Sequence, residues 1–405
     1  MTMIASSPHN SSFTLLLIEA GLTLVAVATA FTFPRFFSRL FARCEGAFAS
    51  LARRKRLACA TVGASALLLR LALLPFFPVP LPFLPDDFSF LLAADTFAHG
   101  RLTNLPPLMW AHFESVHVTV LPTYTSMYFP GPGLVLAAGK VLFGNPWIGI
   151  LLTTALMCAA ICWALQAWLP PTWALLGGFL SVLRIGLFSY WINTYTGGAP
   201  IAALGGALVL GSLPFWVAGT AMSVYTIPHY LAPFTVAAYI LGIQALRHLR
   251  AATAGGGAPV GRTFVRLAVT VCIVMAGLRA FSAPLHLAPS QSSIGAWEDT
   301  WLGPGHFGAQ RAAIVNKLDR IPGNHLVLVR YESSHDPMDE WVYNDANIDG
   351  SRIIWARDMD AVSNQELIRF YGDRDVWLVQ PDADRGRLSP YPNSPALMAA
   401  GMRKP

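Results

Sequence analysis

Long apolar runs separated by short polar stretches occupy most of the chain as far as residue 281. A helix that crosses a membrane needs about 20 mostly apolar residues. The runs that approach this length predict membrane spans at residues 13–33, 57–77, 147–169, 173–190, 199–213, 229–246 and 267–281. The pattern therefore predicts a mainly α-helical fold, built as a polytopic bundle of transmembrane helices.

One further apolar run, residues 128–144, is predicted to lie on the membrane surface without crossing it. Pro130 and Pro132 interrupt its beginning and Lys140 interrupts its end, so the unbroken part is too short for a span. We therefore expect an interfacial helix within one large outer loop at residues 82–146.

Toward the C-terminus the pattern changes to short mixed elements. Runs rich in β-branched and aromatic residues predict strands at 325–331, 351–356 and 375–380. Helical spacing predicts helices at 310–320 and 365–371, the second with a capping box made by Ser363 and Glu366. The chain thus divides into an N-terminal span and basic segment (1–56), a transmembrane domain (57–284) that contains the outer loop, and a small soluble α/β domain (295–405).

Composition and charge agree with a membrane protein. Charged residues are 12% of the chain and hydrophobic residues 54%, whereas a soluble domain carries about 25% charged residues. From Gly295 onward there are 16 acidic and 12 basic residues, while the rest of the chain has 6 acidic and 16 basic residues. The basic residues flank apolar runs and form no stripe with aromatics, which favours membrane lipid over nucleic acid as a partner.

The distribution of basic residues also predicts an orientation. Residues 35–56 hold seven basic side chains and one acid, Glu45, and are expected to be cytoplasmic. The next span then places the outer loop outside, and the last span places the C-terminal domain outside. Residues 247–266 hold four arginines and no acid, so they should be cytoplasmic as well.

That second cytoplasmic loop requires an outward crossing between residues 213 and 228. A helix of this length covers only about 23 Å of a hydrocarbon core that is about 30 Å thick. Either the crossing is short and distorted, or helices are missing from this part of the chain.

Candidate chemistry begins with the acidic pair Asp86 and Asp87, directly after the second predicted span. Two adjacent carboxylates at a membrane boundary repel each other, and such a pair suits a general base or a cation site. The alternative is that one of them caps the helix predicted to follow, where the helix dipole favours negative charge. The two interpretations are compatible.

Other polar groups of the outer loop are His112, Glu114 and His117. The zinc-protease motif needs two histidines four residues apart, and here they are five apart, so we assign no metal site. The three side chains are candidates to bind an acceptor, phosphate or a divalent ion; the alternative is an amphipathic loop with its polar face in water. The acidic residues around His335 are predicted to form a solvated loop face, not a calcium site.

Three basic groups lie in or beside predicted spans. Arg70 is inside the second span, Arg184 is near the outer end of the fourth, and His229 begins the sixth. An unpaired charge in a span is costly, so these residues are functional candidates. The alternatives are snorkelling of the arginines to the interface and a partly exposed interfacial histidine.

The outer loop resembles a known family. The order is a span, Pro85-Asp86-Asp87, a helix ending near Gly100, a proline-interrupted helix and a span. It resembles the first outer loop of the GT-C glycosyltransferases, above all the protein O-mannosyltransferase and lipid A aminoarabinose transferase branch, which carries Pro-Asp-Glu at this point. A bacterial group of mannosyltransferase-like membrane proteins is similar over residues 86–92 and 94–104.

The resemblance implies a hexosyl- or pentosyltransferase in a bacterial plasma membrane. The donor would be a polyprenyl-phosphate-linked sugar and the acceptor a glycan, lipid or protein. Asp86 would be the general base and Asp87 its partner, while Arg70, Arg184 and His229 would lie near the phosphate. No cofactor is firmly implied, although a divalent cation is an option.

The chain also departs from the family pattern. Residues 189–199 contain no acid where the aminoarabinose branch has a second one, which puts metal use in doubt. The closer bacterial group has additional helices where this chain has only the short segment 213–228. One alternative is therefore a truncated, inactive relative that binds lipid or a partner. A second alternative, a transporter, should show internal repeats and several charged spans.

Overall fold

The computed structural model describes residues 10–208, 232–282, 284–285, 287, 308–383 and 387–392. Its chain divides into two compact units. The helical unit comprises Met1–Pro80 and Ile150–Gly305, and the loop–sheet unit comprises Leu81–Gly149 and His306–Pro405. The predicted outer loop thus packs with the C-terminal region, whereas the sequence had suggested grouping it with the transmembrane domain.

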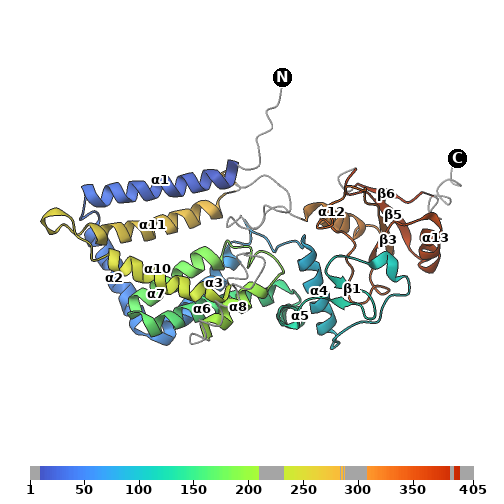
Figure 1. The fold of residues 1–405 in the computed structure, drawn as a ribbon, viewed down its shortest axis with the longest axis horizontal. Coiled ribbons are helices and arrows are strands. Elements are labelled where there is room, and N and C mark those ends of the chain that lie inside the picture. The colour runs from blue at the N-terminus through green and yellow to red at the C-terminus, as the bar shows by residue number, and fades with distance from the viewer. Residues whose placement is uncertain are drawn as a thin grey trace, which may run out of the picture. The chain divides into compact units, whose positions relative to one another are not determined.

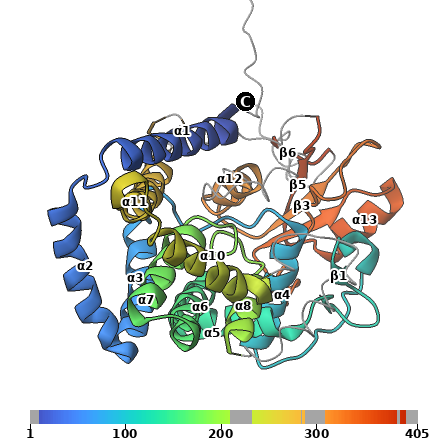
Figure 2. The ribbon, with the colours of Figure 1, turned by 60° about the vertical axis from the view of Figure 1, so that its left-hand side comes forward.

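Helices form the described part of the helical unit (Figure 1). In chain order they are α1 Asn10–Thr32, α2 Ser38–Arg53, α3 Lys55–Ala72, α6 Trp147–Trp168, α7 Pro171–Ser181 continued by the π-turn Val182–Gly186, α8 Gly198–Leu208, α10 Thr235–Leu249 and α11 Val260–Ala280. Helix α1 runs alongside α11, and α2 packs against α3 and α7 (Figure 2).

Three described helices are long and apolar enough to cross a membrane. These candidate spans are Thr14–Thr32, Trp147–Trp168 and Val260–Ala280, in α1, α6 and α11. Among the other predicted spans, the helices that the structure describes are shorter or more charged, whereas residues 209–231, with the end of the span predicted at 199–213 and the predicted crossing at 213–228, lie outside the described residues. Helix α3 carries Lys55, Arg56 and Arg70, and α10 has 15 residues, which is about 22 Å of helix. The predicted seven-span bundle is thus shown only in part.

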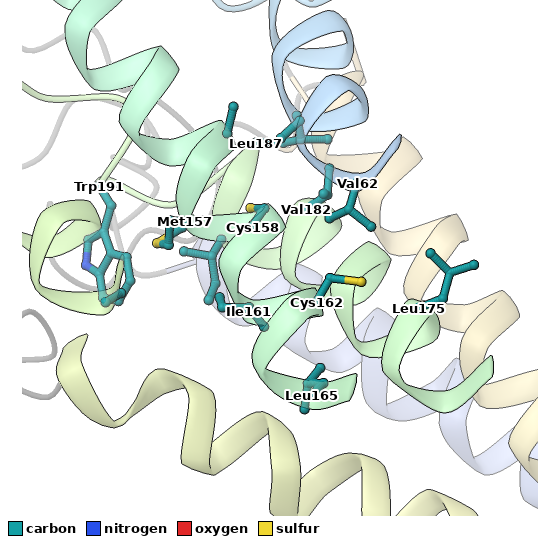
Figure 3. Packing of buried hydrophobic residues seen from close by; sticks show 14 of the residues in the cluster. Val62, Met157, Cys158, Ile161, Cys162, Leu165, Leu175, Val182, Leu187 and Trp191 are labelled. Atoms are coloured by element: carbon teal, nitrogen blue, oxygen red, sulfur yellow. The ribbon is translucent and has the colours of Figure 1, made fainter. Parts of the chain in front are cut away.

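Helices α3, α6 and α7 share the core of the helical unit (Figure 3). Val62, Cys158 and Cys162 are fully buried there. A Cβ added to Gly178 would lie 2.8 Å from Cys162 Cβ and 2.9 Å from Val62 Cγ2. The glycine therefore permits the close approach of α7 to α3 and α6, as small residues do in packed membrane helices.

The loop–sheet unit combines helices with a small sheet. Its elements are α4 Pro85–Ala98, the 3₁₀ turn Trp110–Phe113, β1 Val118–Thr119, β2 Thr125–Ser126, α5 Pro130–Phe143, α12 Ala309–Leu318, β3 His325–Val329, β4 Ile353–Arg357, α13 Ala361–Phe370, β5 Asp375–Val379 and β6 Leu388–Pro390. The three predicted C-terminal strands and two helices are confirmed, with ends shifted by up to four residues.

The sheet has the order β4-β3-β5-β6, with the first three strands parallel and β6 antiparallel. One face packs on α13 and on Leu92 of α4, and the other face packs on Ile314 and Leu318 of α12. Central strand β3 is buried along its whole length, because both faces are covered. The helix after the acidic pair is therefore part of the core of the C-terminal domain.

Two local predictions needed correction or refinement. The cap of α13 is Asp360, whose carboxylate accepts the N–H groups of Val362 and Ser363 at 3.0 and 3.1 Å, so the predicted Ser363 cap is wrong. Asp360 has the extended backbone of an N-cap residue, and Ser363 already lies in the first turn. Pro130 and Pro132 begin α5 without breaking it, because the first turn of a helix needs no N–H donors.

Candidate functional site

Asp87 is a structural cap for helix α4. Pro85 is the first helical residue, and Asp87 lies in the first turn. The buried Asp87 carboxylate accepts the N–H groups of Phe83 at 3.3 Å and Leu84 at 3.4 Å. The predicted N-cap position is therefore wrong, because the helix begins at Pro85 and Leu84 is the N-cap residue. Asp87 instead binds the N-cap N–H from the first turn, and this contact fixes the backbone next to Asp86.

Asp86 forms a separate polar cluster with His117 and Tyr128. His117 Nδ1 lies 2.6 Å from Asp86 Oδ1, and the Tyr128 hydroxyl donates to the same carboxylate oxygen. Tyr128 Oη is also 3.0 Å from His117 Nδ1. The side chains of His117 and Asp86 are 26% and 30% exposed. The carboxylate is therefore both oriented by two partners and reachable from solvent.

A small hairpin brings His117 and Tyr128 together. Strands β1 and β2 pair Val118 with Ser126, and the N–H of Met127 donates to the carbonyl of His117 at 3.2 Å. His117 precedes β1 and has a left-handed backbone with φ 63°, while Tyr128 follows β2. Residues 11 positions apart in sequence thus meet at the open end of the hairpin.

Helix α4 packs against the β1–β2 hairpin through Ser89 and Phe90, which lie one helical turn after Asp86. The Ser89 hydroxyl is 2.6 Å from the carbonyl oxygen of His117 and 2.7 Å from Ser126 Oγ. Phe90 stacks on Tyr128 with ring centroids 4.6 Å apart. Since residues three and four apart share one helix face, Asp86, Ser89 and Phe90 present a single surface to the hairpin.

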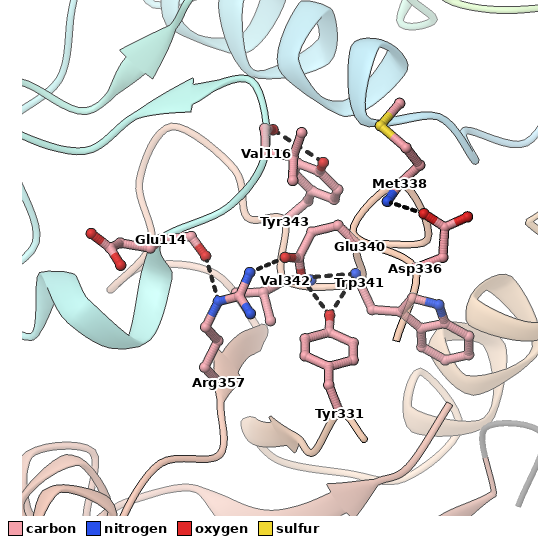
Figure 4. A network of polar contacts seen from close by, with 10 residues as sticks. All are labelled: Glu114, Val116, Tyr331, Asp336, Met338, Glu340, Trp341, Val342, Tyr343 and Arg357. Atoms are coloured by element: carbon pink, nitrogen blue, oxygen red, sulfur yellow. Dashed lines mark hydrogen bonds and ion pairs between the residues drawn. The ribbon is translucent and has the colours of Figure 1, made fainter. Parts of the chain in front are cut away.

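The C-terminal region clamps the segment that leads into His117 (Figure 4). The Tyr343 hydroxyl donates to the carbonyl of Val116 at 3.1 Å, and Arg357 Nε donates to the carbonyl of Glu114 at 2.8 Å. His112 Nδ1 lies 2.9 Å from the carbonyl oxygen of Arg357. Residues more than 200 positions later in the chain therefore set the path of the backbone before His117.

Arg357 is itself held by the buried carboxylate of Glu340. Glu340 has a 3% exposed side chain, binds the Arg357 guanidinium, and accepts from the Tyr331 hydroxyl (Figure 4). It also accepts the N–H groups of Trp341 at 3.0 Å and Val342 at 2.9 Å. Burial, with the Glu340 charge beside it, raises the pKa of the Tyr331 hydroxyl. The predicted solvated loop face is therefore wrong at Glu340.

Asp95 forms a second buried link within the loop–sheet unit. Its side chain is 9% exposed, pairs with Lys140 of α5 and accepts the N–H of Ala346 at 2.8 Å. Burial acts to raise the pKa of this carboxyl, but the hydrogen bonds from Lys140 and Ala346 outweigh it and lower the pKa below 3.8. Asp95 thus ties α4, α5 and the C-terminal region together as a charged group.

The predicted loop trio separates in the structure. His117 contacts Asp86, whereas His112 is buried against Arg357 and the Glu114 side chain is exposed. Tyr128 and Ser89 were missed by sequence reasoning. Tyr128 was counted as the first residue of the apolar run at 128–144. The residues around Ser89 in sequence do not distinguish it from a serine that faces water.

The predicted cations belong to the helical unit. Arg70 is fully buried and donates from Nη1 to the carbonyl of Phe77 at 2.8 Å and from Nη2 to Asn193 Oδ1 at 3.0 Å. Its guanidinium thus makes its contacts inside the protein, just beyond the end of α3, and the snorkelling alternative stays a prediction. Arg184 is 46% exposed and lies 3.9 Å from Glu19. His229 lies outside the described residues.

The described residues contain no group of three or more His, Cys, Asp or Glu side chains arranged to hold a metal ion. Comparisons with protein-family models, with curated proteins and with solved structures found no match. Over the residues that the structure describes, fold and site define a mainly helical protein with small sheets, three candidate membrane spans and a partly exposed Asp-His-Tyr cluster.

Proposed function

We propose that this chain is a multi-pass membrane glycosyltransferase of the GT-C type, with Asp86 as the general base. It moves a sugar from a polyprenyl-phosphate donor to a hydroxyl of a glycan, lipid or protein acceptor. The observation that carries the proposal is the partly exposed Asp86 carboxylate, held between His117 and Tyr128 at the start of α4. The resemblance of residues 85–104 to the first outer loop of that family supports it.

In the proposed reaction, Asp86 accepts the proton of the acceptor hydroxyl. The hydroxyl oxygen forms a bond to the anomeric carbon, and the bond from that carbon to the phosphate oxygen breaks. The electron pair leaves on the lipid phosphate, which is a good leaving group. His117 and Tyr128 keep the carboxylate in one orientation, and Asp87 fixes the helix terminus beneath it.

Positive charge near the departing phosphate would stabilise the transition state. Arg70, Arg184 and His229 remain the proposed source of that charge, as the family resemblance implies. The exposed guanidinium of Arg184 suits direct contact with phosphate. The main-chain and Asn193 contacts of Arg70 suit a role in holding the end of α3.

The first test measures transfer of labelled sugar in membranes that contain the full chain, with a panel of polyprenyl-phosphate donors. Asp86→Asn is expected to lower transfer by about 100-fold, because general-base catalysis contributes at least this much. Glu366→Gln, an exposed acid on α13, serves as the matched control and should keep the wild-type rate.

Equal transfer by wild type and Asp86→Asn would refute the general-base role. Transfer by neither protein with any donor of the panel would favour the alternative of an inactive, lipid- or partner-binding relative. Thermal unfolding of both variants shows whether a lost activity reflects chemistry or loss of the fold.

We also propose that the loop–sheet unit lies outside the plasma membrane and that α2 lies on the cytoplasmic side. Leu105 is 89% exposed in the outer loop, and Ala47 is exposed on α2. Leu105→Cys in intact cells should therefore react with a membrane-impermeant maleimide above the background of the native cysteines. Ala47→Cys should gain labelling only after permeabilisation, and the opposite pattern would reverse the proposed orientation.

A further inference from the structure

A groove of about 600 Å³ lies in the helical unit between α2, α7 and α11. Its lining is mostly apolar and includes Phe41, Phe48, Trp173, Leu176, Val269 and Ile273. Helix α2 supplies one wall with its apolar face, while its opposite face carries exposed basic side chains. The groove thus lies beside the segment with the strongest concentration of positive charge in the sequence.

Three charged side chains, Glu45, Arg250 and Arg266, are part of the lining of the groove. Arg266 binds Glu45 with both ends of its guanidinium, Nε to Oε1 at 2.9 Å and Nη2 to Oε2 at 2.9 Å. Arg250 Nη1 adds a contact to Oε1 at 3.0 Å. Burial opposes ionisation of Glu45, but these arginines lower its pKa to about 2. Two guanidinium groups therefore face one carboxylate, and one positive charge is left over.

The surplus charge is available mainly at Arg250. Its side chain is 32% exposed, whereas that of Arg266 is 7% exposed. The guanidinium of Arg250 lies 6.0 Å from the ring centroid of Trp173. An aromatic face that supports the cation leaves its outward N–H groups directed away from the ring, where an anion can bind.

We propose that this groove binds an anionic phospholipid. One acyl chain occupies the apolar lining, and the phosphate of the headgroup binds Arg250. A free phosphate ion would leave the apolar lining without a partner, and a neutral lipid would leave the surplus charge unbalanced. The basic residues Arg39, Arg43 and Arg53 of α2 add attraction to an anionic membrane surface.

This proposal does not rest on the proposed sugar transfer, because the groove is lined by none of the residues assigned to that reaction. Its test is direct lipid binding by the purified full chain in detergent, with phosphatidylglycerol and phosphatidylcholine compared by native mass spectrometry. Phosphatidylglycerol should bind at least about fivefold more tightly, the effect of one basic group beside an anionic headgroup.

Arg250→Gln should remove this preference, because Arg266 still neutralises Glu45 and no surplus charge remains. Arg247→Gln is the matched control, since Arg247 lies in the last turn of α10, just before Arg250, contacts only Gln244 among the hydrogen bonds described for it, and does not line the groove. Leu176→Trp should weaken binding of both lipids by filling the apolar lining, and thermal unfolding checks that each variant is folded.

Equal binding of the two lipids by wild type, or an unchanged preference in Arg250→Gln, would overturn the proposal. Release of phosphatidylglycerol by inorganic phosphate at equal concentration would show an anion site that does not use the lipid chain, and would overturn the lipid assignment as well.

Discussion

Replacing Glu340 with alanine is expected to lower the free energy of unfolding by about 4 kcal/mol. The change removes the buried acceptor of the Tyr331 hydroxyl and of the Val342 N–H, and it leaves Arg357 without its carboxylate. The Trp341 N–H keeps the Tyr331 oxygen as an acceptor at 2.8 Å. Each buried donor without a partner costs about 1–3 kcal/mol. Thermal and denaturant unfolding of the full chain, followed by tryptophan fluorescence, measures the loss.

Two further variants make this prediction specific. Glu340→Gln keeps an acceptor oxygen but loses the charge, so its loss should be about half as large. Glu332→Ala removes an exposed acid from the loop between β3 and β4, which also contains Glu340. This change should alter the free energy of unfolding by less than about 0.5 kcal/mol. Similar losses in Glu340→Ala and Glu332→Ala would mean that the buried network does not hold the domain.

The network also has a consequence for the Asp86 site. Arg357 holds the backbone of Glu114, three residues before His117. Glu340→Gln protein that is still folded should therefore lose the proposed sugar transfer while retaining its secondary structure. Arg357 acts here as a positioning residue, through the path of the loop and without contact to a reacting group.

Replacing Asp95 with alanine is expected to cost about 3 kcal/mol of unfolding free energy. The buried N–H of Ala346 loses its acceptor, and Lys140 loses its counter-charge. Because Lys140 is 40% exposed, water offsets part of the lost ion pair. Asp373→Ala removes an exposed acid of the same unit and is the matched control.

The contribution of the Asp95 charge should depend on pH in a defined direction. The pKa of Asp95 in the folded protein lies below its ordinary value of 3.8. The stabilisation is therefore complete above pH of about 4 and is lost as the pH falls through the folded-state pKa. The stability difference between wild type and Asp95→Asn should shrink below pH 3.8; a difference that stays constant there would show that charge plays no part.

Local pattern predicted many elements well. The β-rich runs became β3, β4 and β5, and the apolar runs at 13–33 and 147–169 became α1 and α6. These features depend on the spacing of apolar residues within a short stretch of sequence, so neighbouring residues are enough to predict them. Helix ends were less certain, as at Asp360 and Ser363, because either residue type can cap a helix.

The candidate site was predicted in part. Asp86 was identified by its pairing with Asp87, and His117 by the polar loop around it. Tyr128 was not, because only the β1–β2 pairing places its hydroxyl beside Asp86. The separation of roles within the acidic pair, one carboxylate capping α4 and the other facing His117, also requires the orientation of the first helical turn.

By itself, the sequence determined a helix-rich chain with apolar helices long enough to cross a membrane, an acidic C-terminal α/β region and a basic segment around α2. These properties follow from composition and from the spacing of apolar residues. Only the tertiary structure decided that α4 packs on the C-terminal sheet and that Glu340, Arg357 and Tyr343 control the loop before His117. Such contacts join residues more than 200 positions apart, and their geometry is set by how whole elements pack, which no local pattern encodes.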